Sequence, residues 1–170
     1  MDAAPTPLRS LALADEAATV ALARAMRRRL GPGDVLLLRG PIGAGKSLFA
    51  RAMIQALLAD HGQAEEVPSP TYTLVQSYRA GALEIWHADL YRLGSVDEIE
   101  ELGLTAAFET ALCLIEWPER LEALTPCDAL LMDFALAEAP GARHLSLLGP
   151  AARWGWLNEI PDPLPDAVNG

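Results

Sequence analysis

Gly40-Pro41-Ile42-Gly43-Ala44-Gly45-Lys46-Ser47 is the most informative stretch of this 170-residue chain, and its flanks are as informative as its glycines. Residues 35–38 before it are apolar throughout, which is typical of a strand buried on both faces of a parallel sheet. After it, apolar residues recur at helical spacing across residues 47–60. The order of strand, glycine-rich loop and helix predicts an α/β fold.

The stretch matches the pattern Gly-x-x-x-x-Gly-Lys-Ser of a phosphate-binding loop. Glycines let the backbone curl so that its amides point at phosphate oxygens, and the following helix adds the positive end of its dipole. We expect Lys46 to reach the β- and γ-phosphates of ATP, and to face solvent when the loop is empty. The Ser47 hydroxyl is expected to ligate Mg²⁺. The predicted contacts of this segment with the nucleotide are Gly40, Gly43, Ala44, Gly45, Lys46, Ser47 and Leu48.

Magnesium bound to a nucleotide takes one or two protein carboxylates, so an acid is expected at the end of a neighbouring strand. Glu116, Asp89 and Asp133 each lie at or near the end of an apolar strand candidate. Asp133 is the weakest candidate because the apolar pattern continues beyond it. Glu116 is preferred to Asp89 because its strand is fully apolar, as a central parallel strand is, and Trp117 and Pro118 end that strand at once.

His87-Ala88-Asp89-Leu90-Tyr91-Arg92 places an imidazole, a carboxylate, a phenol and a guanidinium within six residues. Asp89 could orient the water that attacks the γ-phosphate, and Arg92 could stabilise the transferred charge or hold the carboxylates in place. The same spacing equally fits a hairpin strand that ends in a salt-bridged turn, and both interpretations stay open. His87 is interpreted as structural. The predicted catalytic residues are Asp89 and Lys46, with Tyr91, Arg92 and Trp117 in support.

The remaining sequence patterns predict a three-layer sandwich with a mainly parallel central sheet and a β-hairpin. Helical spacing covers residues 15–30, with Asp15 as the expected cap, and β-branched and aromatic residues at 73–78 and 83–87 indicate the hairpin. Ser95 and Glu98 form a candidate capping box. Strands are expected at 112–115, 129–134 and 144–148, and a short helix near Trp154 and Trp156. Arg143, just before a strand, is a further predicted nucleotide contact. We expect one domain over residues 1–160 and a frayed tail over 161–170.

Composition limits the classes of partner. The formal net charge of -10 opposes direct binding of a nucleic acid, and the basic cluster at residues 24–29 is interpreted as a solvated helix face. If the protein acts on a nucleic acid, we therefore expect it to do so only indirectly, through a protein partner. Short apolar runs and the lack of a secretory pattern at the N-terminus predict a cytoplasmic protein that does not bind membranes. Cys113 and Cys127 are interpreted as buried thiols rather than metal ligands.

Five motifs occur together between residues 33 and 120. They are Gly-x-x-Gly-Ala-Gly-Lys-Ser at 40–47, Ser69-Pro70-Thr71-Tyr72-Thr73-Leu74-Val75, His87-x-Asp89-Leu90-Tyr91-Arg92-Leu93, Glu101-Leu102-Gly103 and Ile115-Glu116-Trp117-Pro118. In order and spacing this set closely resembles the TsaE family, also called YjeE. The chain departs from the family pattern at Pro41-Ile42, at Ser47 and at Gln76, where members commonly carry Asp-Leu, Thr and Glu. Serine keeps the magnesium hydroxyl, so Pro41 is the departure that bears on loop chemistry.

The resemblance implies a bacterial P-loop ATPase needed for threonylcarbamoyl modification of adenosine 37 in tRNAs that read ANN codons. It implies the TsaD and TsaB proteins as partners, and ATP hydrolysis that resets their complex, slow alone and stimulated by the pair. By the same resemblance Ser47 and Glu116 are magnesium ligands, Asp89 is needed for hydrolysis, and Thr71 and Tyr72 belong to a switch-like loop. Two alternatives are a small-molecule kinase, for which no lid segment is evident, and an assembly factor that binds ATP without turnover.

Overall fold

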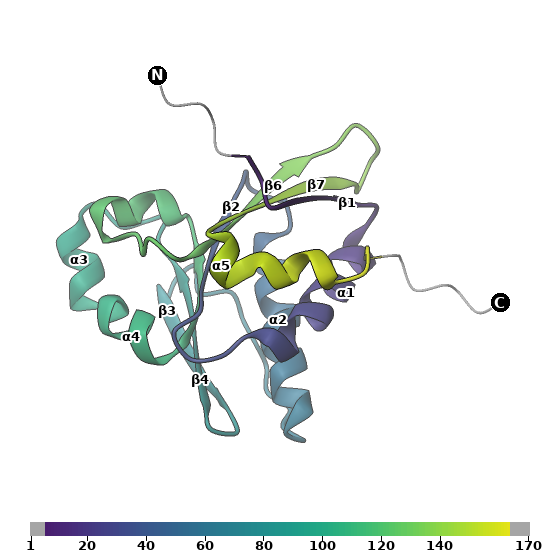
Figure 1. Ribbon diagram of the computed structural model, residues 1–170. Helices are drawn as coiled ribbons and strands as arrows, with labels where there is room; N and C mark the ends of the chain where they lie inside the picture. Colours follow the sequence, from purple (N-terminus) through teal and green to yellow (C-terminus); the bar gives the residue numbers. More distant parts are fainter. Residues whose placement is uncertain (1–5, 164–170) are drawn as a thin grey trace.

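A computed structural model describes residues 6–163 of the chain (Figure 1). Seven strands form one mixed sheet in the order β1-β7-β6-β2-β5-β4-β3. The strands are β1 (Arg9–Leu13), β2 (Val35–Arg39), β3 (Val75–Ala80), β4 (Leu83–Asp89), β5 (Leu112–Glu116), β6 (Leu130–Leu136) and β7 (Arg143–Leu148). The α-helices are α1 (Glu16–Met26), α2 (Lys46–Asp60), α3 (Val96–Glu101), α4 (Leu104–Thr110) and α5 (Ala151–Trp154). Short 3-10 helices cover η1 (Arg27–Arg29), η2 (Pro118–Leu124) and η3 (Gly155–Glu159).

The central strands are parallel, as their apolar sequences predict. Strand β2 pairs in parallel with β5 on one side and with β6 on the other, and β4 pairs in parallel with β5. The predicted hairpin is the antiparallel pair β3 and β4, whose turn is two residues long at Gly81-Ala82. At the other edge β7 runs antiparallel to β6 and β1 runs antiparallel to β7. The α/β fold with parallel central strands is therefore confirmed, and antiparallel strands at both edges make the sheet mixed.

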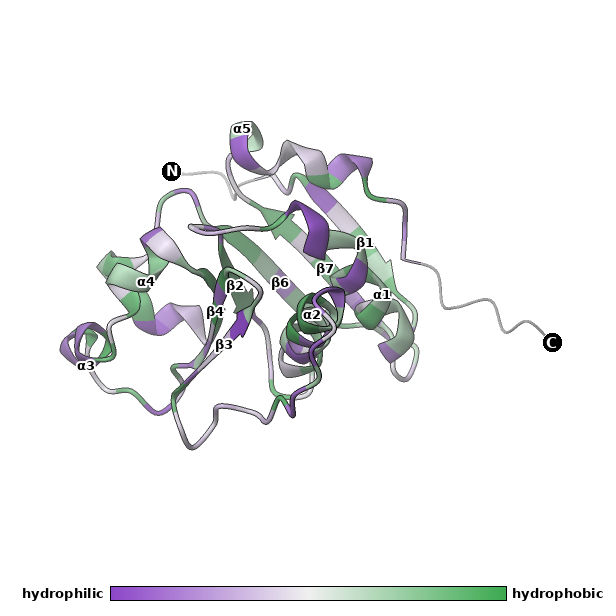
Figure 2. Cartoon of the chain, turned by 90° about the horizontal axis from the view of Figure 1, so that it is seen from below, coloured by the Kyte–Doolittle hydropathy of each residue, from purple (hydrophilic) through white to green (hydrophobic). Residues whose placement is uncertain are grey.

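Two hydrophobic cores lie on opposite faces of the sheet and produce the three layers. Alternate residues of β2 divide between them: Leu36 and Leu38 pack with α1 and α2, whereas Val35 and Leu37 pack with α3 and α4. This division follows from the period-two geometry of a strand. In Figure 2 the strands of the central sheet are predominantly hydrophobic, between helices that carry hydrophilic residues on their outer sides.

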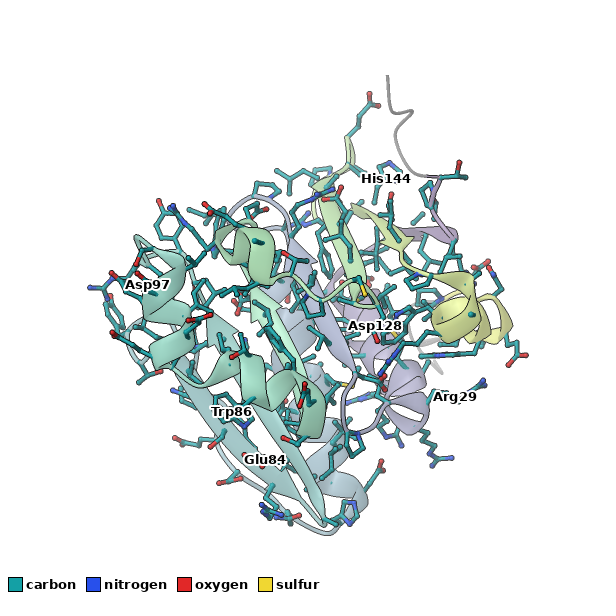
Figure 3. All side chains as sticks on the ribbon, turned by 60° about the vertical axis from the view of Figure 1, so that its left-hand side comes forward. Arg29, Glu84, Trp86, Asp97, Asp128 and His144 are labelled. Carbon is teal, nitrogen blue, oxygen red and sulfur yellow. The ribbon has the colours of Figure 1, made fainter. Side chains whose placement is uncertain are left out.

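Trp154 is fully buried in the first of these cores, and its indole nitrogen donates to the backbone carbonyl of Asp128 at 2.7 Å. Asp128 lies beside α5, where its carboxylate also accepts a hydrogen bond from Arg153 at 2.6 Å (Figure 3).

Three elements were not predicted from the sequence: strand β1, helix α4 and the 3-10 helix η2. Two predicted details are wrong. Ser95 makes no side-chain cap of α3, and the Glu98 carboxylate accepts from the backbone amide of Gly94 at 3.3 Å instead of from Ser95. Cys127 is exposed rather than buried, while Cys113 is buried in the second core.

Asp15 caps α1 as expected, because its carboxylate accepts a hydrogen bond from the Ala18 amide at 2.9 Å. The predicted frayed tail lies mostly outside the described residues, although Asp162, at its start, accepts a hydrogen bond from Arg9 at 2.7 Å. Among residues 6–163, none of the helices is long and apolar enough to span a bilayer.

Candidate nucleotide-binding site

The predicted phosphate loop connects the end of β2 to the first residue of α2, at the carboxyl edge of the parallel strands. Gly40, Gly43 and Gly45 all have positive φ angles, of 148°, 81° and 105°. Gly40 also has a spatial reason to be glycine, since a Cβ atom there would lie 2.5 Å from the carbonyl oxygen of Phe134 on β6. The loop can therefore pass close to the neighbouring strand before it turns into α2.

A cavity of about 600 Å³ opens beside this loop. Residues of the loop and of the β4 and β5 strand ends line it, and so do residues from the start of α1 and from β7. The lining residues are Asp15, Glu16, Thr19, Ile42, Gly43, Ala44, Gly45, Lys46, Ser47, Leu48, Arg51, Thr71, Asp89, Tyr91, Glu116, Trp117, Gly141 and Arg143. Most of the predicted site residues are thus brought to one place; Gly40, Tyr72 and Arg92 are not part of the lining.

Lys46 is folded back into the protein, which contradicts the expectation that it faces solvent. Its side-chain amine donates to the carbonyl of Gly40 at 2.6 Å and lies 3.6 Å from the centroid of the Trp117 ring. The residue is 5% exposed. Burial lowers the pKa of Lys46, and the nearby carboxylates of Glu116, Glu119 and Asp89 act in the opposite direction. The amine therefore lies next to the loop, in contacts that a phosphate could replace.

Ser47 and Glu116 meet at the bottom of the cavity. The Ser47 hydroxyl donates to Oε1 of Glu116 at 2.7 Å. Glu116 reaches this position because β5 pairs with β2 and places Glu116 beside Leu38, two residues before the loop begins. The second carboxylate oxygen, Oε2, lies 2.7 Å from Nε2 of His87. Asp133, the weakest magnesium candidate, pairs instead with Arg39 at 2.8 Å on the other side of β2.

Asp89 lies directly beside Glu116 across the parallel pair β4 and β5. It is buried, and Oδ1 accepts the backbone amide of Tyr91 at 3.0 Å. Oδ2 lies 3.5 Å from the hydroxyl of Thr71, whose oxygen is in turn 2.8 Å from that of Ser69. Two carboxylates, of Asp89 and Glu116, therefore share the carboxyl edge of adjacent strands, and one of them is in contact with the predicted switch-like loop.

The switch-like loop exposes Tyr72, which is 86% exposed. The guanidinium of Arg92 lies 5.8 Å from the centroid of the Tyr72 ring, in the range of a cation–π contact. Arg92 forms no ion pair with Asp89 or Glu116 in the described structure, so the expectation that it holds these carboxylates is wrong. Its contact is with the loop instead.

Two other supporting residues, Tyr91 and Trp117, line the cavity and contact each other with tilted rings. The rings of Tyr91 and Trp117 have centroids 4.8 Å apart, and Trp117 has a left-handed backbone with φ of 58°. Arg143, at the start of β7, donates to the carbonyl of Gly43 at 2.8 Å and so lies against the phosphate loop. The aromatic pair and the arginine all line the cavity.

Several lining residues were missed from the sequence. Asp15, Glu16 and Thr19 come from the start of α1, which was read as an ordinary cap, and Arg51 lies one turn along α2 from Ser47. His87 was interpreted as structural, although it touches Glu116. The sequence did indicate a place for His87 in the site, because side chains alternate along a strand and residues 87 and 89 therefore lie on the same face.

The chain is similar in sequence to a known protein family. The family model described as "Threonylcarbamoyl adenosine biosynthesis protein TsaE" matches residues 13–144. The chain belongs to the TsaE family. The matched region extends beyond residue 120, where the motif resemblance weakens, and includes Arg143.

Curated TsaE relatives come from several bacteria. The tRNA threonylcarbamoyladenosine biosynthesis protein TsaE of Rickettsia conorii is 43% identical over 115 residues, which is 67% of this chain and 64% of the relative. The protein of the same name from Bacillus subtilis is 38% identical over 113 residues, 66% of this chain and 68% of the relative. The matched regions span 64% and 68% of the length of these two relatives.

A solved structure supports the TsaE fold. The crystal structure of Bacillus subtilis YdiB matches with a TM-score of 0.70 and 26% identity, over 89% of this chain and 91% of the YdiB chain. The mixed seven-stranded sheet with parallel central strands is therefore the fold of a TsaE protein.

Proposed function

We propose that this chain, as one domain over residues 1–160, binds ATP with Mg²⁺ and hydrolyses it in support of threonylcarbamoylation of adenosine 37 in tRNAs that read ANN codons. The observation that carries the proposal is the pair formed by Ser47 and Glu116, 2.7 Å apart beside the phosphate loop. Their hydroxyl and carboxylate oxygens are the donors that Mg²⁺ takes from a P-loop protein.

A magnesium site with two protein donors fits the side chains at the end of β5. Within the described part of the chain, no three His, Cys, Asp or Glu side chains are grouped as metal ligands. Mg²⁺ that accompanies a nucleotide does not need such a group, because it keeps several waters and also binds phosphate oxygens. When bound, Mg²⁺ would neutralise charge on the β- and γ-phosphates. Ser47 and Glu116 would hold it there.

The remaining side chains have separate roles in the proposed reaction. Lys46 exchanges the carbonyl of Gly40 for phosphate oxygens and places its charge beside the β- and γ-phosphates. Asp89 accepts a hydrogen bond from the attacking water and orients it toward the γ-phosphate. Thr71 contacts the same carboxylate from the switch-like loop, so the position of the loop and that of the water are linked through Asp89.

The partners proposed for this chain are the TsaB and TsaD proteins, with tRNA reached through them. The net charge of -10 opposes approach of a polyanion, which favours a protein surface as the direct contact. The cytoplasm, where tRNA is modified, is the proposed location. An assembly factor that binds ATP without turnover would use the same cavity, and the position of Asp89 favours hydrolysis over that alternative.

Turnover and partner binding test the proposal together. ATP hydrolysis is measured for the purified chain alone and with the TsaB–TsaD pair, and titration calorimetry measures the affinity for the pair in ATP and in ADP. We expect slow turnover alone, stimulation by the pair, and tighter association in ATP. Equal affinity in both nucleotides would refute the switch, and the absence of turnover under all conditions would leave a binding protein.

A matched pair of variants examines the switch-like loop. Thr71→Val removes the hydroxyl near Asp89 with little change in volume, and we expect it to reduce the difference between the two affinities. Thr73→Val is the control, because the Thr73 hydroxyl accepts from Gln76 and has no contact with Asp89. If both variants keep the wild-type difference, Thr71 does not couple the loop to the nucleotide.

A further inference from the structure

His87 is a buried histidine outside the set of residues assigned to the reaction above. It is 1% exposed, and β4 places it on the same face of the sheet as Asp89, two residues later. Asp89 lies opposite Glu116 in the adjacent strand, so the same face also carries Glu116. The parallel register therefore brings the His87 ring next to the Glu116 carboxylate, with Nε2 and Oε2 2.7 Å apart.

The direction of this hydrogen bond follows from the chemistry of the two groups. An ionised carboxylate accepts hydrogen bonds and cannot donate them, so Nε2 of His87 carries the hydrogen. The other ring nitrogen, Nδ1, is buried and has no hydrogen-bond partner within residues 6–163. The ring is thus fixed through Nε2, by its contact with Glu116.

Packing alone does not explain a histidine at this position. The neighbouring positions on the same face, Ile85 on β4 and Leu112 and Leu114 on β5, are fully buried apolar residues. An apolar side chain would suit these surroundings, and it would avoid a buried nitrogen without a partner. Within the described residues, the one hydrogen bond of the His87 side chain is with Oε2 of Glu116.

The two oxygens of Glu116 have different partners. Oε2 meets His87, and Oε1 accepts the Ser47 hydroxyl at 2.7 Å. A carboxylate held at one oxygen cannot rotate freely about its last bond, so the other oxygen keeps its direction. Partners of this kind orient metal ligands.

We propose that His87 is a positioning residue for the magnesium site, which fixes the Glu116 carboxylate through Oε2 and keeps its Oε1 directed at Ser47. The inference rests on the proposed magnesium site and adds a residue to it. His87 acts through Glu116 and does not touch the nucleotide in this arrangement.

Three substitutions separate positioning from packing. His87→Gln keeps an N–H donor at nearly the distance of Nε2 from the backbone. His87→Asn has the same amide group on a shorter side chain, which reaches the position of Nδ1 and not that of Nε2. His87→Leu removes the donor. His61→Asn, at the exposed C-terminal end of α2, is the control histidine.

The measurement is the affinity of the purified chain for ATP, by titration calorimetry, as the Mg²⁺ concentration is varied and also with EDTA present. We expect His87→Asn and His87→Leu to raise the Mg²⁺ midpoint, the Mg²⁺ concentration that gives half of the increase in ATP affinity, by about 10- to 100-fold. His87→Gln should stay within about threefold of the wild type, by the same principle that a retained hydrogen bond preserves metal affinity. All variants should bind ATP in EDTA like the wild type.

The proposal is overturned if the asparagine and glutamine variants have equal Mg²⁺ midpoints, or if all three substitutions weaken binding in EDTA to the same degree. Circular dichroism identifies a variant that fails to fold, and the comparison of glutamine with asparagine remains decisive if leucine does so. If ATP binding by the wild type does not depend on Mg²⁺, both the proposed magnesium site and the role of His87 are wrong. If wild-type binding depends on Mg²⁺ but the asparagine and glutamine variants have equal Mg²⁺ midpoints, only the role of His87 is wrong.

Discussion

Gly40→Ala should destabilise the fold even when no nucleotide is present. The wild-type residue has φ of 148°, and the added Cβ would lie 2.5 Å from the carbonyl oxygen of Phe134 and 3.1 Å from its Cβ. These atoms belong to or adjoin the backbone of β6, so they cannot move aside as the end of a flexible side chain can. The end of β2 would have to move away from β6.

The expected size of the effect has two parts. An unfavourable backbone conformation costs about 1–3 kcal/mol, and overpacking of a close contact costs about 1–3 kcal/mol. Their sum, about 2–6 kcal/mol, lowers the melting temperature of a chain of this size by about 2–4 °C for each kcal/mol. We therefore expect a decrease of at least about 4 °C.

Two other glycines are matched controls for this estimate. Gly43 has φ of 81° and no atom within 4 Å of an added Cβ, so Gly43→Ala isolates the cost of the backbone conformation, about 1–2 kcal/mol. Gly155 has right-handed helical geometry and equally open surroundings, so Gly155→Ala should leave stability unchanged or raise it. Thermal unfolding followed by circular dichroism gives all three values. Equal melting temperatures for the alanine variants at positions 40 and 43 would refute the role of the contact with Phe134.

Further predictions concern the cavity. Lys46→Ala should weaken ATP binding by about 10- to 100-fold, the value of a hydrogen bond to a charged group; unchanged affinity by calorimetry, with a normal circular dichroism spectrum, would contradict the phosphate loop. Asp89→Asn should keep ATP affinity and reduce hydrolysis by about 100-fold or more, and wild-type turnover would make its cluster structural. Glu116→Gln should weaken binding in Mg²⁺ but not in EDTA, and equal losses in both would argue against a metal ligand. Arg143→Ala should lower ATP affinity by about tenfold through loss of its contact with the Gly43 carbonyl, measured in the same titrations; an affinity equal to the wild type would remove it from the site.

The elements predicted correctly are those whose sequence carries a strong local pattern. The apolar runs of β2 and β5 identified two central parallel strands, because strands buried on both faces have no polar alternation. Strand β1 was missed because it begins with the polar pair Arg9-Ser10 and has no continuous apolar run. It is defined by its pairing with β7. Helix α4 was missed because only Leu104 and Ala107 of its seven residues are buried.

The arrangement of the site depends on contacts between distant residues, which a local pattern cannot supply. The preference for Glu116 over Asp133 came from the strand sequence, and the structure places Glu116 beside Ser47. The buried position of Lys46 could not be predicted, because its amine contacts the ring of Trp117, 71 positions further along the chain. The contact of His87 with Glu116 likewise depends on the register of β4 and β5.

The unequal burial of the two cysteines makes the natural sequence suitable for attaching one spectroscopic probe. Burial raises the pKa of the Cys113 thiol to about 12, so this side chain stays protonated and inaccessible to reagents that attack thiolates. Cys127 is exposed and precedes β6, whereas the phosphate loop follows the carboxyl end of the parallel neighbour β2. A fluorophore coupled to Cys127 would thus lie the length of a strand from the nucleotide, where it can report the approach of a partner while the cavity stays unlabelled.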